Sequence, residues 1–132
     1  MKSFKLKIVT PQGIYKETDI EILNIRTTNG QVGILANHLP FASGLEISNM
    51  NFLEKGKREE YAIAGGFIYV GENETTVIAN AIESKEEIDL NRAQEAKKRA
   101  EERLSSKAKD IDLLRAEIAL RKALNRISVK TK

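Results

Sequence analysis

Basic residues in the second half of the chain recur at the spacing of an α-helix. Arg92 and Arg99 are seven residues apart, which is two helical turns, so a helix would place both on one face. Arg115, Lys122 and Arg126 follow at i, i+7 and i+11 and would share a face of a second helix. If the two helices fold back on each other, these cations can converge on one polyanion, since arginine forks match phosphate oxygens.

A simpler interpretation accounts for the same residues without a ligand. Asp89 precedes the first helical stretch and can cap its N-terminus. The arginines can form i,i+4 ion pairs with Glu95, Glu102 and their neighbours on a solvated face. Spacing alone leaves both interpretations open.

Residue types that several kinds of catalysis need are missing from the sequence. It contains no cysteine, which excludes disulfides, thiolate nucleophiles and cysteine zinc sites, and His38 is the single histidine. It also has no glycine-rich phosphate loop and no nucleophile placed beside a general base. We therefore predict no catalytic residue, no metal site and no hydrolysis by this chain.

The distribution of residue types divides the 132-residue chain into two parts. All seven aromatics, eight glycines and two prolines lie at or before Gly71. Glycine and proline mark turns and aromatics favour strands, so most of the remainder is expected to be helical, with the helices beginning near Asp89. Residues 1–86 carry nine Lys/Arg against eleven Asp/Glu, whereas residues 87–132 carry thirteen against eight. The basic excess is confined to the predicted helices, and it is too small for a dedicated nucleic-acid binder.

The first part has the pattern of an antiparallel β-sandwich. FKLKIVT at 4–10 alternates apolar and polar residues, and IEILNIRTT at 20–28 repeats this period of two. NGQVGIL at 29–35 places Asn-Gly before a β-branched run, which is a strong hairpin signal. Further candidate strands lie at 44–49, 51–55, 59–63, 66–71 and 75–82. Turns every 8 to 12 residues or so suit an antiparallel sandwich or barrel, and we expect one in residues 1–85.

The core of this domain is predicted from the apolar positions of these strands. It is expected to contain Phe4, Leu6, Ile8, Ile22, Ile25, Val32, Ile34, Ile63, Phe67, Tyr69, Val77 and Ile78. The Gly65-Gly66 pair is expected to permit a bulge or a close approach of two backbones.

Residues 86–132 are predicted to form an antiparallel two-helix hairpin, which makes the chain α+β in sequence. Ala93, Ala96, Ala100 and Leu104 recur at spacings of three and four, and after SSKAKD the pattern continues through 113–127. Buried alanine releases much less free energy than the roughly 1.5–3 kcal/mol of a fully buried Leu or Ile. The helices should therefore hold each other weakly and exist either docked or extended, with a static hairpin as the alternative.

Three motifs, in this order and at this spacing, resemble a known family. NGQVGILANHLP at 29–40, AGGFIYV at 64–70 and IDLNRAQEAKKRAEERL at 88–104 are similar to segments of the epsilon subunit of bacterial F-type ATP synthase. The resemblance covers essentially the whole chain. It implies a non-catalytic subunit whose ten-stranded sandwich binds the gamma subunit and the membrane c-ring as part of the rotor.

The same resemblance implies regulation and a location. In that family the C-terminal helices inhibit ATP hydrolysis when they extend toward the catalytic alpha and beta subunits. The expected location is peripheral, at the cytoplasmic face of the bacterial cell membrane; the sequence has no run of 18 apolar residues and no signal-peptide core. Gln31 and His38 lie in the loop implied to contact the c-ring, and Gln31 stands where many members carry an acidic residue.

The segment Ile88–Ala93 matches the I/L-D-x-x-R-A motif of ATP-binding members. The resemblance implies an ATP site formed by Glu83, Ile88, Asp89, Arg92, Ala93, Arg99 and Arg126, in which the three arginines bind the phosphates. A small alanine lets the adenine ring approach, and a carboxylate can accept a hydrogen bond from its amine. ATP is thus expected as a regulatory ligand, with magnesium possible and no cofactor required.

The extended helices would present basic side chains to acidic segments of the catalytic subunits. The candidates are Arg99, Arg103, Arg115, Arg121, Lys122 and Arg126. Two other function classes stay open: a stand-alone nucleotide-sensing module with a helical lid, and a nucleic-acid-binding sandwich with a basic arm. The second ranks last, because the basic segment contains no aromatic residue on which bases could stack.

Overall fold

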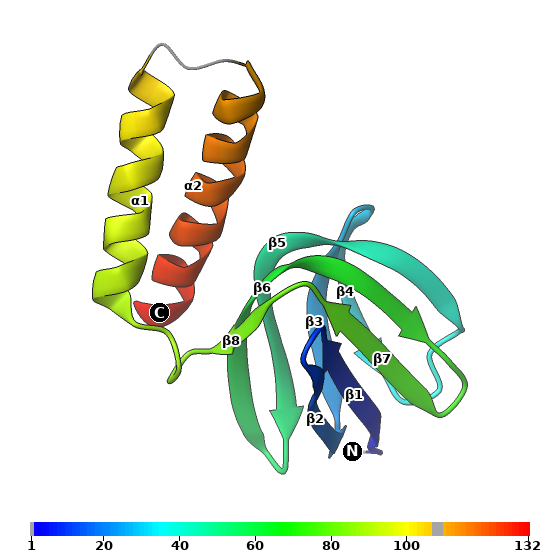
Figure 1. The fold of residues 1–132 in the computed structure, drawn as a ribbon. Coiled ribbons are helices and arrows are strands. Elements are labelled where there is room, and N and C mark those ends of the chain that lie inside the picture. Colours follow the sequence, from blue (N-terminus) through cyan, green and yellow to red (C-terminus); the bar gives the residue numbers. More distant parts are fainter. Residues whose placement is uncertain (1, 107–109) are drawn as a thin grey trace.

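The computed structural model describes residues 2–106 and 110–132, which form a β-domain followed by two helices (Figure 1). The strands are β1 (Phe4–Thr10), β2 (Gly13–Ile20), β3 (Ile22–Thr27), β4 (Gly30–Leu35), β5 (Phe41–Glu54), β6 (Lys57–Val70), β7 (Glu74–Ala79) and β8 (Ile82–Ser84). The helices are α1 (Leu90–Ser105) and α2 (Asp110–Lys130). The predicted fold class is confirmed, and part of the predicted interruption at 105–110 lies outside the described residues.

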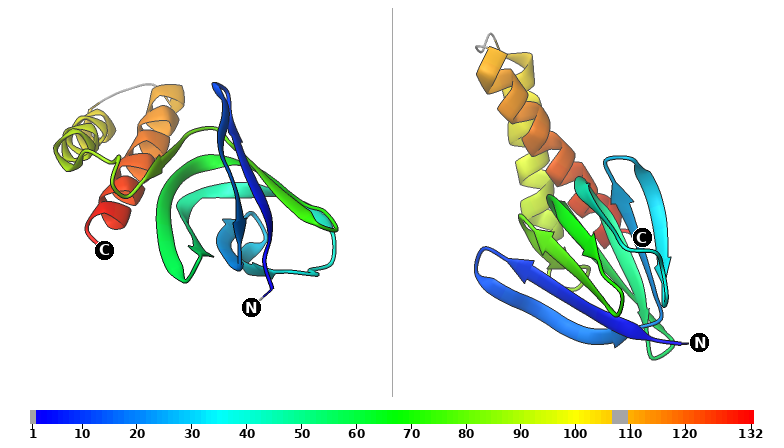
Figure 2. Two further views of the ribbon diagram at one scale, coloured as in Figure 1. Left: turned by 90° about the horizontal axis from the view of Figure 1, so that it is seen from below. Right: turned by 90° about the vertical axis from the view of Figure 1, so that its right-hand side faces the viewer.

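The strands belong to one hydrogen-bonded sheet that folds over on itself around a core (Figure 2). Their order is β2-β1-β7-β6-β5-β3-β4, and β8 pairs with β6. The described pairs are antiparallel except β1 with β7, which is parallel. β5 and β6 have 14 residues each and span segments predicted as two strands apiece, so eight strands roughly match the ten expected. β2 is not among the expected strands, because GIYKETDI lacks a clear alternation.

The glycine pair in β6 lies where β7 approaches most closely. Gly65 has φ 83° and Gly66 has φ 142°, which are backbone conformations that other residues rarely adopt. A Cβ built on Gly66 would lie 2.0 Å from the carbonyl oxygen of Ile78. The predicted close approach of two backbones is confirmed.

The core agrees with the prediction in most positions but differs on β6 and β7. Leu6, Ile8, Ile25, Ile34, Ile63 and Val77 are buried as expected. Phe67, Tyr69 and Ile78 are 40%, 50% and 41% exposed, so their assignment to the core was wrong. The physical reason is the period of two: with Ile68, Val70 and Val77 facing inward, their immediate neighbours must face outward. Ile22 and Val32 are half-buried, and the core also contains Leu23, Met50, Phe52 and Tyr61.

The two helices lie side by side and antiparallel (Figure 1). Their buried residues facing each other are alanines, namely Ala93 and Ala100 of α1 and Ala116 and Ala123 of α2. Leu114 and Leu124 are 56% and 44% exposed and add little to this interface. The predicted alanine-rich interface is therefore confirmed, and the hydrophobic free energy that holds the hairpin closed is small.

The hairpin meets the sandwich through the last turns of α2. Val129 of α2 packs with Ile88 of the linker and Ala62 of β6, and all three are buried. Most of the other contacts of α2 with the sheet lie on β5 and β6, and Arg126 of α2 also reaches Glu83 of β8. None of the described helices is long and apolar enough to cross a membrane.

Candidate functional site

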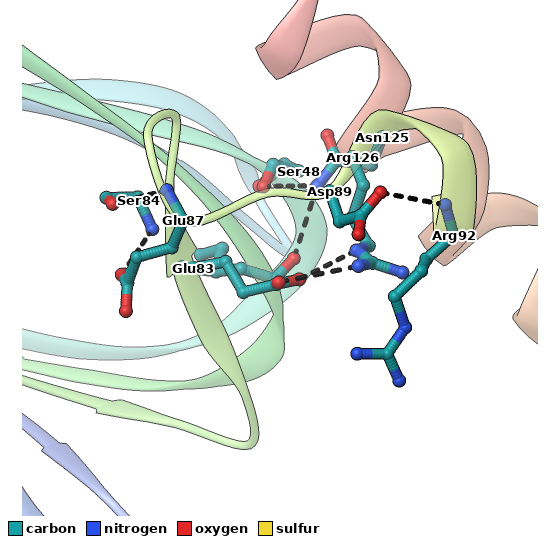
Figure 3. A network of polar contacts seen from close by, with 9 residues as sticks. Ser48, Glu83, Ser84, Glu87, Asp89, Arg92, Asn125 and Arg126 are labelled. Carbon is teal, nitrogen blue, oxygen red and sulfur yellow. Dashed lines mark hydrogen bonds and ion pairs between the residues drawn. The ribbon is translucent and has the colours of Figure 1, made fainter. Parts of the chain in front are cut away.

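Glu83 of β8 and Arg126 of α2 form an ion pair between the two domains, beside the linker (Figure 3). Nε of Arg126 lies 2.7 Å from Oε1 of Glu83, and Nη2 donates to Oε2 at 3.4 Å. The buried Nε has no hydrogen-bond partner of acceptable geometry among the described residues, so its contact with Glu83 is one of charge, and the directed hydrogen bond of the pair comes from Nη2. The side chains remain 25% and 34% exposed, so a ligand can reach both.

A polar cavity of about 530 Å³ opens at this ion pair and extends along α1. We call it the nucleotide cavity, after the ligand that the resemblance implies for its arginines; it is lined by Glu83, Arg92, Glu95, Ala96, Arg99 and Arg126. Three separate elements, β8, α1 and α2, supply these residues. The structure thus brings together all three arginines that the resemblance assigned to phosphate, and it adds Glu95 and Ala96. A cavity of this size is in the range that holds a ligand as large as a nucleotide.

A smaller, more apolar cavity of about 180 Å³ adjoins the nucleotide cavity and shares Glu83 and Arg126 with it. Its walls are Ala62, Ile63, Ala64, Ala81 and Ile82 on the sandwich and Lys122 and Asn125 on α2. None of the five apolar residues was predicted from the sequence to belong to a site. Because strand residues reach this position only through the folded sheet, no local pattern in the sequence could have indicated them.

The motif at the start of α1 has a structural role in this conformation. Asp89 is the N-cap of α1, and its Oδ1 accepts a hydrogen bond from the backbone N–H of Arg92 at 3.1 Å. Ile88 is 2% exposed and Ala93 is fully buried, so neither opens to the nucleotide cavity. The ligand-free interpretation of Asp89 as a cap is confirmed. No ion pair of Arg92 or Arg99 is found within residues 2–106 and 110–132, so their side chains are available to an anion.

Asn125 links α2 to two neighbouring strands of the sandwich. Its side-chain Nδ2 donates to the backbone carbonyl of Ser48 on β5 at 2.8 Å and to that of Ile63 on β6 at 3.4 Å (Figure 3). Two lysines add hydrogen bonds near the C-terminus. Nζ of Lys130 donates to the backbone carbonyl of Lys85 at 2.9 Å, and Nζ of Lys85 donates to that of Lys132 at 2.6 Å. Docking of the hairpin is therefore mainly polar, and water can replace such bonds at little net cost.

The linker between the domains is tied to the sandwich by Glu87. Its carboxylate accepts hydrogen bonds from the Tyr15 hydroxyl and from the backbone N–H of Ser84, the latter at 2.9 Å. The bond from Tyr15, followed by that from Ser84, holds the pKa of Glu87 below its usual value. Burial, and next the bond to Glu87, raises the pKa of the Tyr15 hydroxyl. The linker therefore leaves the sandwich at a defined point.

This arrangement predicts a dependence of stability on pH. Because the folded-state pKa of Glu87 is depressed, its contribution to stability is present above its unfolded-state pKa. The contribution is lost as the pH falls from that value through the lower folded-state pKa. Tyr15→Phe removes the hydrogen bond that contributes most to the depressed pKa of Glu87. Over this window the free energy of unfolding of the variant should therefore fall by roughly 0.5 kcal/mol less than that of wild type, an amount kept small by solvent screening. Urea unfolding at several pH values measures this difference, and parallel pH profiles of the two proteins would contradict the prediction.

The other predicted site residues are dispersed over the surface. Nδ1 of His38 lies 2.8 Å from the carbonyl oxygen of Leu39, as in a locally bonded turn, while Gln31 is exposed and lines a cavity that does not include His38. Arg103 and Arg115 are exposed, and Arg121 lies 3.4 Å from Glu46. Lys122 lines the apolar cavity. The structure does not gather these residues into one site.

Comparison with known proteins matches both parts of the chain to described families. Residues 3–85 match the family described as "ATP synthase, Delta/Epsilon chain, beta-sandwich domain", and residues 86–131 match "ATP synthase, Delta/Epsilon chain, long alpha-helix domain". The ATP synthase epsilon chain of Clostridium novyi is 46% identical over 107 residues, 80% of this chain and 82% of that protein. That of Bacillus subtilis is 42% identical over 110 residues, 83% of each chain.

A solved structure confirms the likeness at the level of the fold. One chain in the cryo-EM structure of the Euglena gracilis mitochondrial ATP synthase, OSCP/F1/c-ring in rotational state 1, superposes with a TM-score of 0.86 at 22% identity. The alignment covers 98% of this chain and 82% of that one. At this identity the comparison shows a shared fold and no more.

Proposed function

From the membership of this chain in the family of ATP synthase epsilon chains, non-catalytic subunits of the central stalk, we propose a role in two parts. The chain joins the rotor through its sandwich, and it regulates the complex through its hairpin. The sandwich would bind the gamma subunit and the c-ring at the cytoplasmic face of the bacterial membrane. The hairpin would inhibit ATP hydrolysis when extended toward the alpha and beta subunits, and ATP would hold it docked. The observation that supports the proposed regulation by ATP is the convergence of three arginines on one interdomain cavity.

An exposed apolar patch on the outer face of the sandwich supports a protein partner there. Phe67, Tyr69 and Ile78 lie on the paired strands β6 and β7, and the two aromatic rings are 5.2 Å apart. Contiguous exposed apolar groups are typical of protein interfaces, with aromatic side chains as the anchors. We assign this patch to the gamma subunit, and the exposed Leu39 beside His38 to the c-ring.

Removal of the patch should weaken assembly without unfolding the sandwich. The double variant Phe67→Ser/Tyr69→Ser deletes two aromatic anchors, so we expect at least a tenfold loss of affinity for a gamma homologue, measured by co-purification and titration. Ile14→Ser is the matched control, since Ile14 is 61% exposed and lies on β2 outside the patch. Equal binding by the double variant and the control would move the gamma contact to another face.

The two adjoining cavities match the two halves of ATP. The nucleotide cavity carries Arg92, Arg99 and Arg126, whose charge suits a triphosphate, and the apolar cavity offers a low-polarity surface for the adenine. Glu83 stands where the cavities meet, so its carboxylate can accept a hydrogen bond from the adenine amine once phosphate engages Arg126. The buried Ile88 and Ala93 would support the start of α1 behind the ligand. Magnesium could accompany the phosphates.

The weak hairpin interface explains how such a ligand could act as a switch. The cavity walls come from both domains, so ATP binds the docked state better and shifts the population toward it. When nucleotide is scarce, the extended hairpin would carry Arg103, Arg115, Arg121 and Lys122 toward the catalytic subunits. Because α1 and α2 have good intrinsic helix formers, each can stay helical when undocked.

Calorimetry with ATP tests this proposal directly. Arg92→Ala removes one phosphate ligand and should weaken ATP binding about tenfold, as expected for a charge-assisted hydrogen bond. Arg103→Ala is the matched control, since it lies on α1 but does not line the nucleotide cavity. No heat from wild type, or equal affinities for the two variants, would remove ATP from this cavity. Binding of ATP with no affinity for a gamma homologue would instead favour the stand-alone nucleotide-sensing module.

A further inference from the structure

We infer that a second interdomain cavity, separate from the nucleotide cavity, binds a small oxyanion and thereby also favours the docked hairpin. This β5 cavity has a volume of about 480 Å³ and lies between α2 and the outer face of β3, β4 and β5. Its polar walls are Arg26, Gln31, Glu46, Ser48, Asn49, Arg121 and Asn125. It shares no residue with the nucleotide cavity and only Asn125 with the apolar one.

The cavity exists because β5 bends away from β3 over a few residues. The two strands pair at Asn24 with Asn51 and again at Thr27 with Leu45, so two residues of β3 face five of β5. Over the same stretch β5 stays paired with β6, from Ile47 with Ala64 onward. Such bulges free backbone groups from the ladder. The bulge of β5 therefore opens a polar hollow where α2 docks.

Helix α2 closes this hollow at one side. Asn125 bonds the carbonyl of Ser48 within the bulge at 2.8 Å, and Arg121, one turn earlier, reaches Glu46 at 3.4 Å. The wall opposite is the β3–β4 hairpin, where Arg26 pairs in register with Gln31. Arg26 and Arg121 thus line one cavity although they come from different domains.

The charges of the lining residues indicate the class of ligand. Two guanidinium groups face the cavity against the single carboxylate of Glu46, which is already paired with Arg121. Arg26 forms no ion pair within the described part of the chain. The side-chain amides of Gln31 and Asn49 add donors, whereas the two N–H groups of Asn125 are already used by the carbonyls of Ser48 and Ile63. A small oxyanion, either phosphate or a carboxylate, would find both arginines in the walls of this one cavity and would balance the excess positive charge.

The ligand would act on the conformation of the hairpin. Undocking moves Arg121 and Asn125 away from Arg26 and so dismantles the cavity. An oxyanion therefore binds only the docked state and stabilises it by its affinity for that state. This effect needs no nucleotide, and it would be coupled reciprocally to any ligand that also requires docking.

The test is a titration of the full chain with inorganic phosphate in the absence of nucleotide, with chloride keeping the ionic strength constant. NMR follows the Arg Nε–H and Asn125 side-chain signals, and a parallel melting curve reports stability. We expect saturable binding that raises the melting temperature. Arg26→Ala should weaken the affinity for phosphate about tenfold, because the substitution removes one charge-assisted contact. Glu46→Gln should strengthen this affinity, because the competing carboxylate is gone.

Two further variants locate the site. Arg58→Ala, which changes an exposed arginine bonded to Asn51 on the same sheet, should leave the affinity unchanged. Phosphate binding that is lost in Arg92→Ala but kept in Arg26→Ala would overturn the inference, because the anion would then occupy the nucleotide cavity. A non-saturable response of equal slope in wild type and Arg26→Ala would also overturn it. Malonate as a second probe distinguishes the source: tighter binding of malonate than of phosphate would point to a carboxylate as the ligand.

Discussion

Arg126→Met is expected to lower the affinity for ATP about a hundredfold, the largest effect on ligand binding among the single changes considered. Arg126 lines both the nucleotide cavity and the apolar cavity, and it carries the ion pair to Glu83. Its loss removes phosphate contacts worth roughly 1.5–3 kcal/mol and leaves the carboxylate of Glu83 facing the triphosphate. Methionine keeps much of the packing of the aliphatic stem. Calorimetry with ATP measures the change.

The matched control is Glu83→Gln, which breaks the same ion pair from the other side. Glutamine keeps an oxygen that can accept a hydrogen bond from adenine, and Arg126 stays free for phosphate. If the pair serves only to dock the hairpin, both variants should lose ATP affinity equally. If Arg126 binds phosphate, Arg126→Met should lose far more. Equal losses would therefore contradict the assignment of Arg126 to the ligand.

Gly66→Ala is expected to destabilise the sandwich by about 3 kcal/mol or more, in the range of severe point changes. The new Cβ would lie 2.0 Å from the carbonyl oxygen of Ile78, and the clash is with backbone, which cannot rotate away as a side chain can. Either β7 moves outward and loses its pairing with β6, or Gly66 leaves its conformation at φ 142°. Urea unfolding followed by tyrosine fluorescence reports the change, because all three tyrosines lie in the sandwich.

Gly30→Ala separates the clash from the backbone conformation. Gly30 has φ 121°, but a Cβ there meets no heavy atom within 4 Å. Gly30→Ala should therefore lower the free energy of unfolding only by the cost of placing an alanine at this unfavourable φ, about 1–2 kcal/mol. A Gly66→Ala variant no less stable than Gly30→Ala would show that β7 adapts to the added methyl group.

The predictions from sequence succeeded where local chemistry determines structure. The period of two in FKLKIVT and the Asn-Gly hairpin signal correctly predicted strands, and the alanine spacing after residue 88 correctly predicted helices. The last glycine at residue 71 marked the boundary too early, because β7 and β8 follow it. Asp89 was recognisable as an N-cap because a cap depends only on the next three residues. The error at Phe67, Tyr69 and Ile78 arose because apolar residues fill consecutive positions in β6 and β7, and hydrophobicity alone does not then indicate which face is inside.

The same distinction between local and tertiary determinants applies to the candidate site. The spacing of Arg92 and Arg99 placed them on one face of α1, and the structure puts both in the nucleotide cavity. The apolar walls from β6 to β8, the role of Asn125 and the β5 cavity had no counterpart in any motif. They depend on the bulge of β5 and on where α2 lies against the sheet.

By itself the sequence determined the two kinds of secondary structure, the alanine-rich and therefore weak hairpin, and the basic residues that the hairpin carries. Each of these follows from side-chain type and from spacing within about a dozen residues. The resemblance assigned Glu83 and Arg126 to one site, but only the tertiary structure decided that these residues, 43 positions apart, form a direct ion pair, and that Arg26 and Arg121 share a cavity. The physical reason is that these pairs join residues of different domains, whose approach is set by the packing of Val129, Ile88 and Ala62 and by the bonds of Asn125.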